Sequence, residues 1–348
     1  MRPLRNIIIV ICLSLLGLLD LKAQDVQLSQ FHVADLLMNP ALTGSKHRNR
    51  LMFHQRWQWP SLPGSYNTSL FSYDRFFYKY KVGLGANIMT DNQGDGIIRT
   101  TIINTQYSYE TELTDKIGMR LGAQLGMFNK RLNDEDLIYS SQVTADGIDY
   151  GYLPEKLGKI SYTQPDFAAG GILYTDKIWL SVSAYHLNKP KQDFLGNTSF
   201  YPVRTSFIAG YKFPLGQIKA TRFTGHQKEF YIFPVIHYKT QGKSDQLEAG
   251  IDLINDQLRL GFWYRGIPIK RYDNTLSNHE SFILLAGWRY GNFEFVYSYD
   301  IVISRLERAR TGGAHELHVS FIWPREVKHG NFKKLPCPDF QKATKPVY

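Results

Sequence analysis

Cysteine and long apolar runs are both scarce in this chain. Its 348 residues include only two cysteines, Cys12 and Cys337, and Cys12 lies in an amino-terminal stretch that we expect to be removed. One remaining cysteine excludes an internal disulfide framework. Beyond that stretch no apolar run reaches the roughly 18 residues of a candidate membrane-spanning helix, and the mean hydropathy is -0.30. A disulfide-rich domain and a bundle of transmembrane helices are therefore both excluded.

Clusters of one charge are also scarce, although the formal net charge is +10. The basic residues are scattered among aromatic ones, so we expect no nucleic-acid partner. The exception is the tail 324–348, which holds six basic residues against two acidic ones. Such a tail favours contact with an acidic protein surface or anionic lipid.

The amino end has the features of an export signal. Arg2 and Arg5 precede the apolar run Ile7–Leu19, and Ala23 offers a small residue for cleavage. The apolar run has 13 residues, which is shorter than the roughly 20 that a membrane anchor needs. We expect residues 1–23 to be a signal peptide.

The stretch Lys116–Phe128 alternates between two faces at a period of two, which predicts a strand. Its even positions include Arg120 and Gln124, whereas its odd positions are apolar. Similar stretches recur along the chain. We count fourteen, at 50–59, 66–77, 81–90, 98–112, 116–128, 166–175, 177–187, 203–213, 229–239, 247–254, 257–265, 281–290, 293–302 and 315–323.

This even number of strands behind an export signal predicts an all-β fold, a transmembrane antiparallel outer-membrane β-barrel over residues 50–323. Aromatic residues make up 14% of the chain, which suits the interfacial rings of such barrels. On the first strand Gln55 is the one polar residue expected on the lipid face. The main alternative is a soluble all-β sandwich or propeller.

The connections predict the orientation, because outer-membrane barrels have short periplasmic turns and long outer loops. Tight connections follow the even-numbered strands and long ones the odd-numbered strands, with the stretch 214–228 as an exception. We therefore expect both termini in the periplasm. Residues 24–49 would form a periplasmic or plug segment, and residues 324–348 a periplasmic tail. The long outer loops are expected at 91–97, 129–165, 188–202, 266–280 and 303–314.

No pattern of catalytic or metal-binding residues emerges from the sequence. His54, His186, His237 and His318 fit hydrogen-bonded positions facing the lumen better than general bases. Within the strand 315–323, Glu316 and His318 point to one face and His315 points to the other. Two ligands on one face are too few for a metal site. Residues 91–96 lack the flanking helices and final glutamate of a calcium loop. We predict no cofactor, no metal and no enzymatic activity.

Charged residues on the predicted lumen faces form the main candidate network. On the lipid face near the midplane an arginine would cost about 2–4 kcal/mol, so these residues must point inward. They would fill and stiffen a closed lumen, with an aqueous pore as the alternative. The network comprises Arg56, Arg120, Arg259, Arg289, Glu294, Asp300 and Glu316.

Several short motifs resemble one family of membrane proteins. They are Gln24-Asp25, Ser29-Gln30-Phe31, Asn39-Pro40-Ala41, Gly44-Ser45, Arg56-Trp57-Gln58-Trp59-Pro60, Asp166-Phe167-Ala168-Ala169-Gly170, His186-Leu187-Asn188, Ala209-Gly210-Tyr211, Tyr264-Arg265, His315-Glu316-Leu317 and Cys337-Pro338-Asp339-Phe340. In these motifs the chain resembles the PorP/SprF family of outer-membrane proteins in type IX secretion systems.

The resemblance implies a role in secretion, and in holding client proteins such as adhesins at the surface of a Gram-negative, Bacteroidetes-type bacterium. It also implies links to gliding motility and to periplasmic ring components. Gln30, Phe31, Asn39, Pro40, Ala41 and Gly44 form the amino-terminal family motif. Cys337, Pro338, Phe340, Lys333 and Lys334 would bind periplasmic partners, and loop 129–165 a client at the outer face. The alternative function is a passive channel or transporter for hydrophobic compounds.

Overall fold

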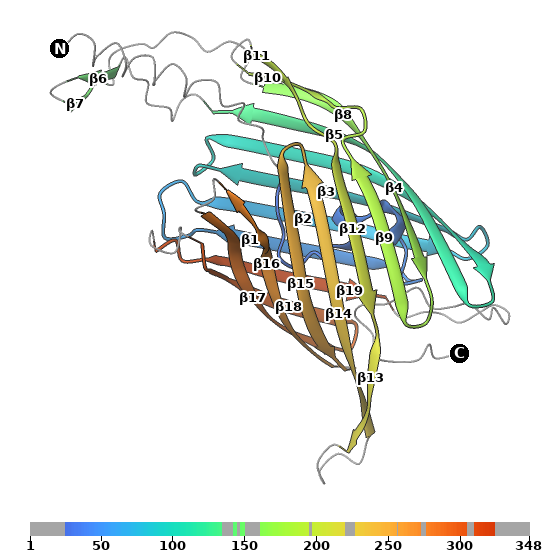
Figure 1. Ribbon diagram of the computed structural model, residues 1–348. Helices are drawn as coiled ribbons and strands as arrows, with labels where there is room; N and C mark the ends of the chain where they lie inside the picture. The colour runs from blue at the N-terminus through green and yellow to red at the C-terminus, as the bar shows by residue number, and fades with distance from the viewer. Residues whose placement is uncertain are drawn as a thin grey trace.

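The computed structural model describes residues 25–133, 142–144, 147–149, 161–194, 197–219, 227–255, 257–272, 276–304 and 310–323. Strands make up almost all of this part, and they wrap around a central lumen (Figure 1). No helix among these residues has the length and apolar character to cross a membrane.

Fourteen antiparallel strands close the barrel. Their bounds are β1 (Arg50–Gln58), β2 (Tyr66–Phe77), β3 (Val82–Gln93), β4 (Ile98–Thr114), β5 (Ile117–Leu132), β8 (Ser161–Tyr174), β9 (Ile178–Tyr185), β12 (Arg204–Tyr211), β14 (Gln227–Gln241), β15 (Ser244–Ile254), β16 (Leu258–Tyr272), β17 (Leu276–Tyr290), β18 (Phe293–Val302) and β19 (Ala314–Ile322). All fourteen predicted strands are confirmed.

Two pairings close the sheet and leave it with no open edge around the barrel. The first strand pairs with the last, as in Arg50 opposite Ile322. In the middle of the chain β12 pairs with β14, as in Arg204 opposite Gln241. Between those two strands β13 (Phe213–Lys219) pairs with the first residues of β14 as a hairpin, which extends beyond the barrel wall (Figure 1). This hairpin explains the long stretch that broke the predicted alternation of connections.

The two faces of β5 have the predicted orientation. Leu121 and Leu125 are exposed on the outside, where lipid would cover them, while Arg120 is fully buried. The lipid-facing misfit Gln55 is satisfied by its neighbours. Its amide group donates to Asn67 (Nε2 to Oδ1 2.5 Å) and accepts from the hydroxyl of Ser69 (2.7 Å).

The connections correct the predicted loops in three places. The stretch 266–280 is mostly strand, because β16 and β17 pair as far as Tyr272 opposite Leu276. The connection between β14 and β15 is only Gly242-Lys243, although it lies at the rim with the longer loops. The loop expected at 129–165 is shorter, since β5 and β8 extend into it, and it contains the hairpin β6 (Val143–Thr144) and β7 (Gly147–Ile148). Another hairpin, β10 (Lys191–Phe194) with β11 (Asn197–Phe200), lies in the connection from β9 to β12.

We call the end of the barrel with the β2–β3, β4–β5, β8–β9 and β17–β18 turns the turn rim, and the opposite end the loop rim. The turn rim is also where β1 begins and β19 ends, because Trp323 donates its backbone N–H to the carbonyl of Asn49 (3.0 Å).

Residues 25–49, which we call the inner segment, lie inside the barrel (Figure 1). They include the short helix α2 (Asp35–Met38) and the 3-10 turn η1 (Pro40–Leu42). The side chain of Asn39 begins η1 by accepting a hydrogen bond from the backbone N–H of Ala41 (2.9 Å). Both elements are too short to be stable alone, so contacts with the wall must hold them.

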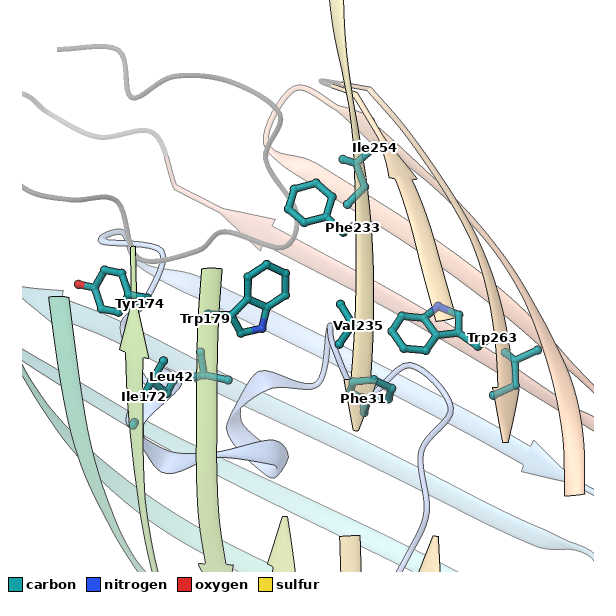
Figure 2. Packing of buried hydrophobic residues seen from close by; sticks show 11 residues of the cluster. Phe31, Leu42, Ile172, Tyr174, Trp179, Phe233, Val235, Ile254 and Trp263 are labelled. Carbon is teal, nitrogen blue, oxygen red and sulfur yellow. The ribbon is translucent and has the colours of Figure 1, made fainter. Parts of the chain in front are cut away.

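The lumen is not polar throughout, although a polar interior is typical of outer-membrane barrels. On one side Phe31, Ala41 and Leu42 of the inner segment pack on a cluster of apolar wall residues (Figure 2). The phenyl ring of Phe31 meets the indole of Trp263 edge to face at 4.9 Å. Apolar residues are tolerated on the inner face because the inner segment, rather than water, covers them. The wall residues of the cluster are Ile172, Tyr174, Trp179, Phe233, Val235, Ile254, Trp263 and Ile283.

Candidate functional site: the filled lumen

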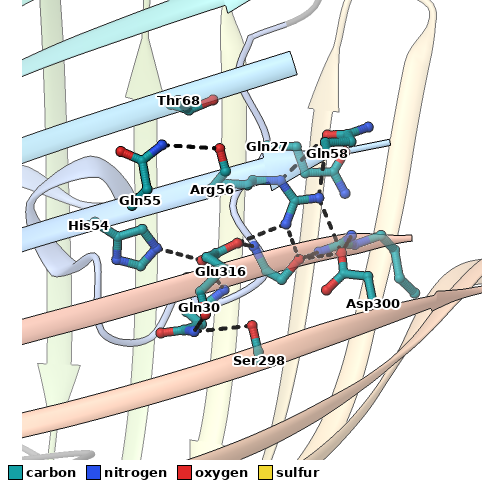
Figure 3. Close-up of polar contacts among 12 residues, drawn as sticks. Gln27, Gln30, His54, Gln55, Arg56, Gln58, Thr68, Ser298, Asp300 and Glu316 are labelled. Atoms are coloured by element: carbon teal, nitrogen blue, oxygen red, sulfur yellow. Dashed lines mark hydrogen bonds and ion pairs between the residues drawn. The ribbon is translucent and has the colours of Figure 1, made fainter. Parts of the chain in front are cut away.

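Glu316 on β19 is the main anchor of the inner segment (Figure 3). Its carboxylate accepts the backbone N–H groups of Ser29 and Gln30, both at 2.8 Å. The same two oxygens contact His54 Nε2 at 2.6 Å and Arg56 Nη1 at 2.8 Å. Glu316 is fully buried. One carboxylate thus joins two barrel strands to the inner segment.

Asp300 on β18 continues this network. Its carboxylate accepts from Arg56 (3.1 Å), Arg265 (3.0 Å) and the hydroxyl of Ser29 (2.5 Å). Arg265 in turn donates Nε to Glu248 on β15 at 2.7 Å. Charge-assisted bonds of this kind are short and strong. They connect five wall strands on one side of the barrel, with Ser29 at their centre.

A second group of charges holds the inner segment near the turn rim. Arg50 is fully buried and bridges Asp35 of the inner segment (2.6 Å) and Asp74 of β2 (2.9 Å). Asp74 also accepts the backbone N–H of Gly44 at 2.7 Å. The backbone of Gly44 has a φ of 70°, which a residue with a side chain adopts at a cost.

A third group surrounds Arg120 of β5. Its guanidinium donates to the carbonyl oxygens of Ala41 (2.8 Å) and Thr43 (2.5 Å) and forms an ion pair with Glu110 of β4 at 2.8 Å. These bonds satisfy carbonyl groups that the short η1 turn leaves free. Arg120 therefore binds the backbone of the inner segment and not its side chains.

Close approach of backbones completes the fit on the side of β5, β8 and β9. Asn39 donates its amide to Ser181 Oγ at 2.8 Å. A Cβ added to Gly170 would lie 2.0 Å from Asn39 Oδ1, and one added to Gly122 would lie 2.2 Å from the backbone nitrogen of Ala41. Only glycine fits at these two wall positions. The inner segment is thus matched to the wall by shape as well as by charge.

The sequence was compared with models of known protein families. The model of the family described as type IX secretion system membrane protein PorP/SprF matches residues 20–321. The chain belongs to this family. No curated protein matches the sequence. The PorP/SprF barrel is therefore a membrane protein of the type IX secretion system, and its location is the outer membrane. The family, one of secretion-system membrane proteins, is non-enzymatic in kind.

Solved outer-membrane barrels are similar to it at low identity. A Pseudomonas aeruginosa FadL homologue has 11% identity and a TM-score of 0.42, covering 81% of this chain and 92% of its own. The toluene transporter TodX of P. putida has the same identity and TM-score, with 84% and 94% covered. Omp33 of Acinetobacter baumannii has 7% identity and a TM-score of 0.39, with 80% and 98% covered.

The predicted charge network lies in separate groups in the PorP/SprF barrel. Arg56, Asp300 and Glu316 meet, whereas Arg120 pairs with Glu110, as described above. Arg259 forms an ion pair with Asp252 of β15, and Arg289 pairs with Glu294 at 3.2 Å near the turn rim.

Sequence reasoning missed several members of these groups. Among them are Asp74, Glu110 and Arg265, each of which has the same parity along its strand as an inward-facing neighbour. This shared parity in the sequence predicts that the three side chains also point into the lumen. Their partners in the inner segment lie far away in sequence, so no spacing could have indicated them.

The family residues in the inner segment all contact the wall or shape the segment. Gln30 donates its amide to the carbonyl oxygen of Glu316 (2.8 Å) and to Ser298 Oγ (3.1 Å). Phe31 lies in the apolar cluster, and Pro40 begins η1. The tail residues Cys337, Pro338, Phe340, Lys333 and Lys334 lie outside the described residues.

The four candidate histidines are buried in the lumen. His237 contacts Glu248 at 2.9 Å through Nδ1, and His54 contacts His318 at 3.2 Å between their Nδ1 atoms. In the described part of the chain no group of histidine, cysteine and acidic residues could hold a metal ion.

The predicted Gly-rich turn 91–96 follows β3 at the loop rim. Asp95 accepts the backbone N–H of Gly64 (2.8 Å) and the hydroxyl of Ser65 (3.0 Å) from the neighbouring β1–β2 connection. The hydrogen bond from Gly64 and then that from Ser65 lower the pKa of Asp95. The turn holds two rim connections together and shows no calcium-binding arrangement among the residues described.

The beginning of the inner segment lies at the loop rim. Asp25 contacts three residues at strand ends there: Arg204 at 2.9 Å, His186 at 2.9 Å and Gln241 at 3.0 Å. Trp323, by contrast, lies at the turn rim. Residues 25 and 323 are therefore on opposite sides of the barrel, whereas the sequence analysis placed both ends on one side.

Substitution of Gly122 should release the inner segment. In the Gly122→Leu variant the new side chain must displace the backbone at Ala41, so we expect Phe31 and Leu36, both buried, to become accessible to chymotrypsin. The control is Ala123→Leu, which adds the same side chain on the lipid face of the same strand. Cleavage after Phe31 at equal rates in both variants would contradict the close fit.

Proposed function

We propose that this outer-membrane barrel is a sealed partner of type IX secretion. It would hold a secreted client protein at its loop rim and contact periplasmic machinery through its tail, residues 324–348. The observation that supports this proposal most strongly is the filled lumen. Protein cargo could pass through the barrel only after three groups of buried charges had separated.

A sealed barrel must act through its rims. In outer-membrane barrels the short turns are periplasmic, so the turn rim would face the periplasm and the loop rim the cell exterior. The connections 133–160 and 186–203 begin and end at strand ends of the loop rim, and they are long enough for recognition of a client. The tail begins after Trp323 at the turn rim, and its basic residues suit an acidic partner.

The rival function is a passive transporter for hydrophobic compounds. It requires the inner segment to move, and it makes a different prediction for purified protein. Recordings in planar bilayers would then show transport or conductance in the intact chain, whereas the proposed partner role requires client binding with a closed lumen.

Removal of the tail tests the proposal. A tagged chain ending at Trp323 should insert into the outer membrane but lose co-purification with periplasmic components of the secretion system. The matched control keeps the full length and replaces Lys333 and Lys334 by glutamine, which should weaken the contact partially if charge contributes to it. Unchanged co-purification of the truncated chain would count against docking through the tail.

A further inference from the structure

A cavity at the loop rim lies between the inner segment and the wall. Its volume is about 100 Å³, several times the roughly 10–15 Å³ that one water molecule needs. Strands β3, β4, β5, β8, β9, β12 and β14 contribute to its lining. The cavity is distinct from the charge groups that fix residues 29–44.

The lining has one apolar side. Leu28 and Leu37 of the inner segment face Met89, Ile102 and Phe128 of the wall. Leu28 and Met89 belong to one buried apolar cluster, against which Leu37 and Ile102 pack. An apolar chain in contact with these residues would be removed from water.

The other side of the lining carries two lysines that form no ion pair among the described residues. Lys130 is buried, and its ammonium group contacts only the hydroxyl of Tyr201, at 3.3 Å, among the described residues. Lys239 also lines the cavity, and no carboxylate of the described part of the chain lies within ion-pair distance of it. A buried charge is costly unless it is paired.

The acidic residues of the cavity are already engaged. Asp166 accepts from His186 at 2.8 Å, and Asp25 is bound by His186 and Arg204. Both carboxylates therefore pair with His186 or Arg204, and neither forms an ion pair with Lys130 or Lys239. The cavity therefore keeps an unmatched positive charge.

A further polar group in the lining has no partner. The hydroxyl of Tyr185 is buried and makes no hydrogen bond to any residue that the structure describes. Arg204 lies over the ring of the same tyrosine at 4.3 Å. A buried hydroxyl without a partner carries a desolvation cost that a bound acceptor would remove.

We propose that this cavity binds an anionic amphiphile, a medium-chain carboxylate whose head group contacts Lys130 and Lys239. Its chain would lie along the apolar side formed by residues 28, 37, 89, 102 and 128. The carboxylate would supply the two ammonium groups with an ion-pair partner and the Tyr185 hydroxyl with an acceptor. This ligand site goes beyond the secretion role and does not depend on it.

Binding of decanoate to the full-length barrel in lipid nanodiscs tests the proposal, with empty nanodiscs as the blank. The measurement is the dissociation constant from equilibrium dialysis with radiolabelled decanoate, and decanol serves as the neutral probe of equal chain length. We expect decanoate to bind specifically and decanol to bind at least about tenfold more weakly, as the loss of a charged hydrogen bond implies.

Variants locate the site. Lys130→Met and Lys239→Met keep the length of the side chain and remove its charge, and each should weaken decanoate binding about tenfold or more. Lys243→Met is the matched control, because Lys243 is exposed in the β14–β15 turn at the same rim, and it should leave the affinity unchanged. Decanoate bound no better than decanol, affinity unaffected by both cavity variants, or no binding above the blank would each overturn the proposal.

Discussion

A barrel that begins at residue 45 is expected to conduct ions in a planar bilayer, whereas the full-length chain remains closed. The missing residues 25–44 include Ser29, Gln30 and Asn39, whose polar groups contact opposite sides of the wall. Without them the lumen is lined by charged residues that water can reach. Larger barrels of the porin type leave such an aqueous channel, so stepwise conductance is expected from the shortened chain alone.

A second variant covers the case in which the shortened barrel does not fold. The full-length chain with Gly122→Leu retains every residue of the inner segment but crowds it against β5. It should show intermittent opening, and Ala123→Leu should stay closed. Steady conductance in the unmodified chain would contradict a sealed lumen, as would a closed lumen in the shortened barrel.

Replacement of Glu316 is expected to cause the largest loss of stability from a single substitution. In Glu316→Gln the buried Arg56 loses one of its two carboxylate partners, and the backbone N–H groups of Ser29 and Gln30 lose a charged acceptor. Breaking a buried ion pair in this way costs about 3–5 kcal/mol. The free energy of unfolding of the refolded barrel in urea, followed by tryptophan fluorescence, measures this loss.

Glu294→Gln is the matched control for this substitution. Glu294 is also buried on a neighbouring strand, but its only ion pair is with Arg289 in the described part of the chain. In that part it forms no hydrogen bond or ion pair with the inner segment. Because the Arg289 side chain is partly exposed and water can reach it, a much smaller loss is expected, on the order of 1 kcal/mol. Equal losses in the two variants would show that the inner segment contributes nothing to the role of Glu316.

The barrel itself could be predicted from the sequence because successive side chains of a strand point alternately to lipid and to the lumen, so apolar and polar residues alternate. On β5 the alternation of Leu121 and Leu125 with Arg120 and Gln124 indicated which face meets lipid. Strand ends were less certain. Residues 266–272 are predicted as part of a loop, yet in the structure the strand pairing continues past a bulge at Gly266.

The interior could be predicted only in part. Inward-facing charges on the strands were identified by their parity, but their partners depend on how residues 25–49 pass through the lumen. Asp35 and Arg50 form an ion pair at 2.6 Å, although nothing in their local sequence indicates the contact. Gly122 appeared in the sequence as one more small residue on the lumen face. Only the structure shows that the backbone of Ala41 lies against Gly122 and leaves no room for a side chain there.

The central claim is that residues 25–49 are a fixed, folded part of the barrel interior. Hydrogen exchange of the full-length chain in nanodiscs tests it most directly, at the backbone amides of Ser29 and Gln30 that donate to Glu316. The account predicts that these amides exchange as slowly as those of the barrel strands. Exchange at the rate of an unfolded peptide would contradict it.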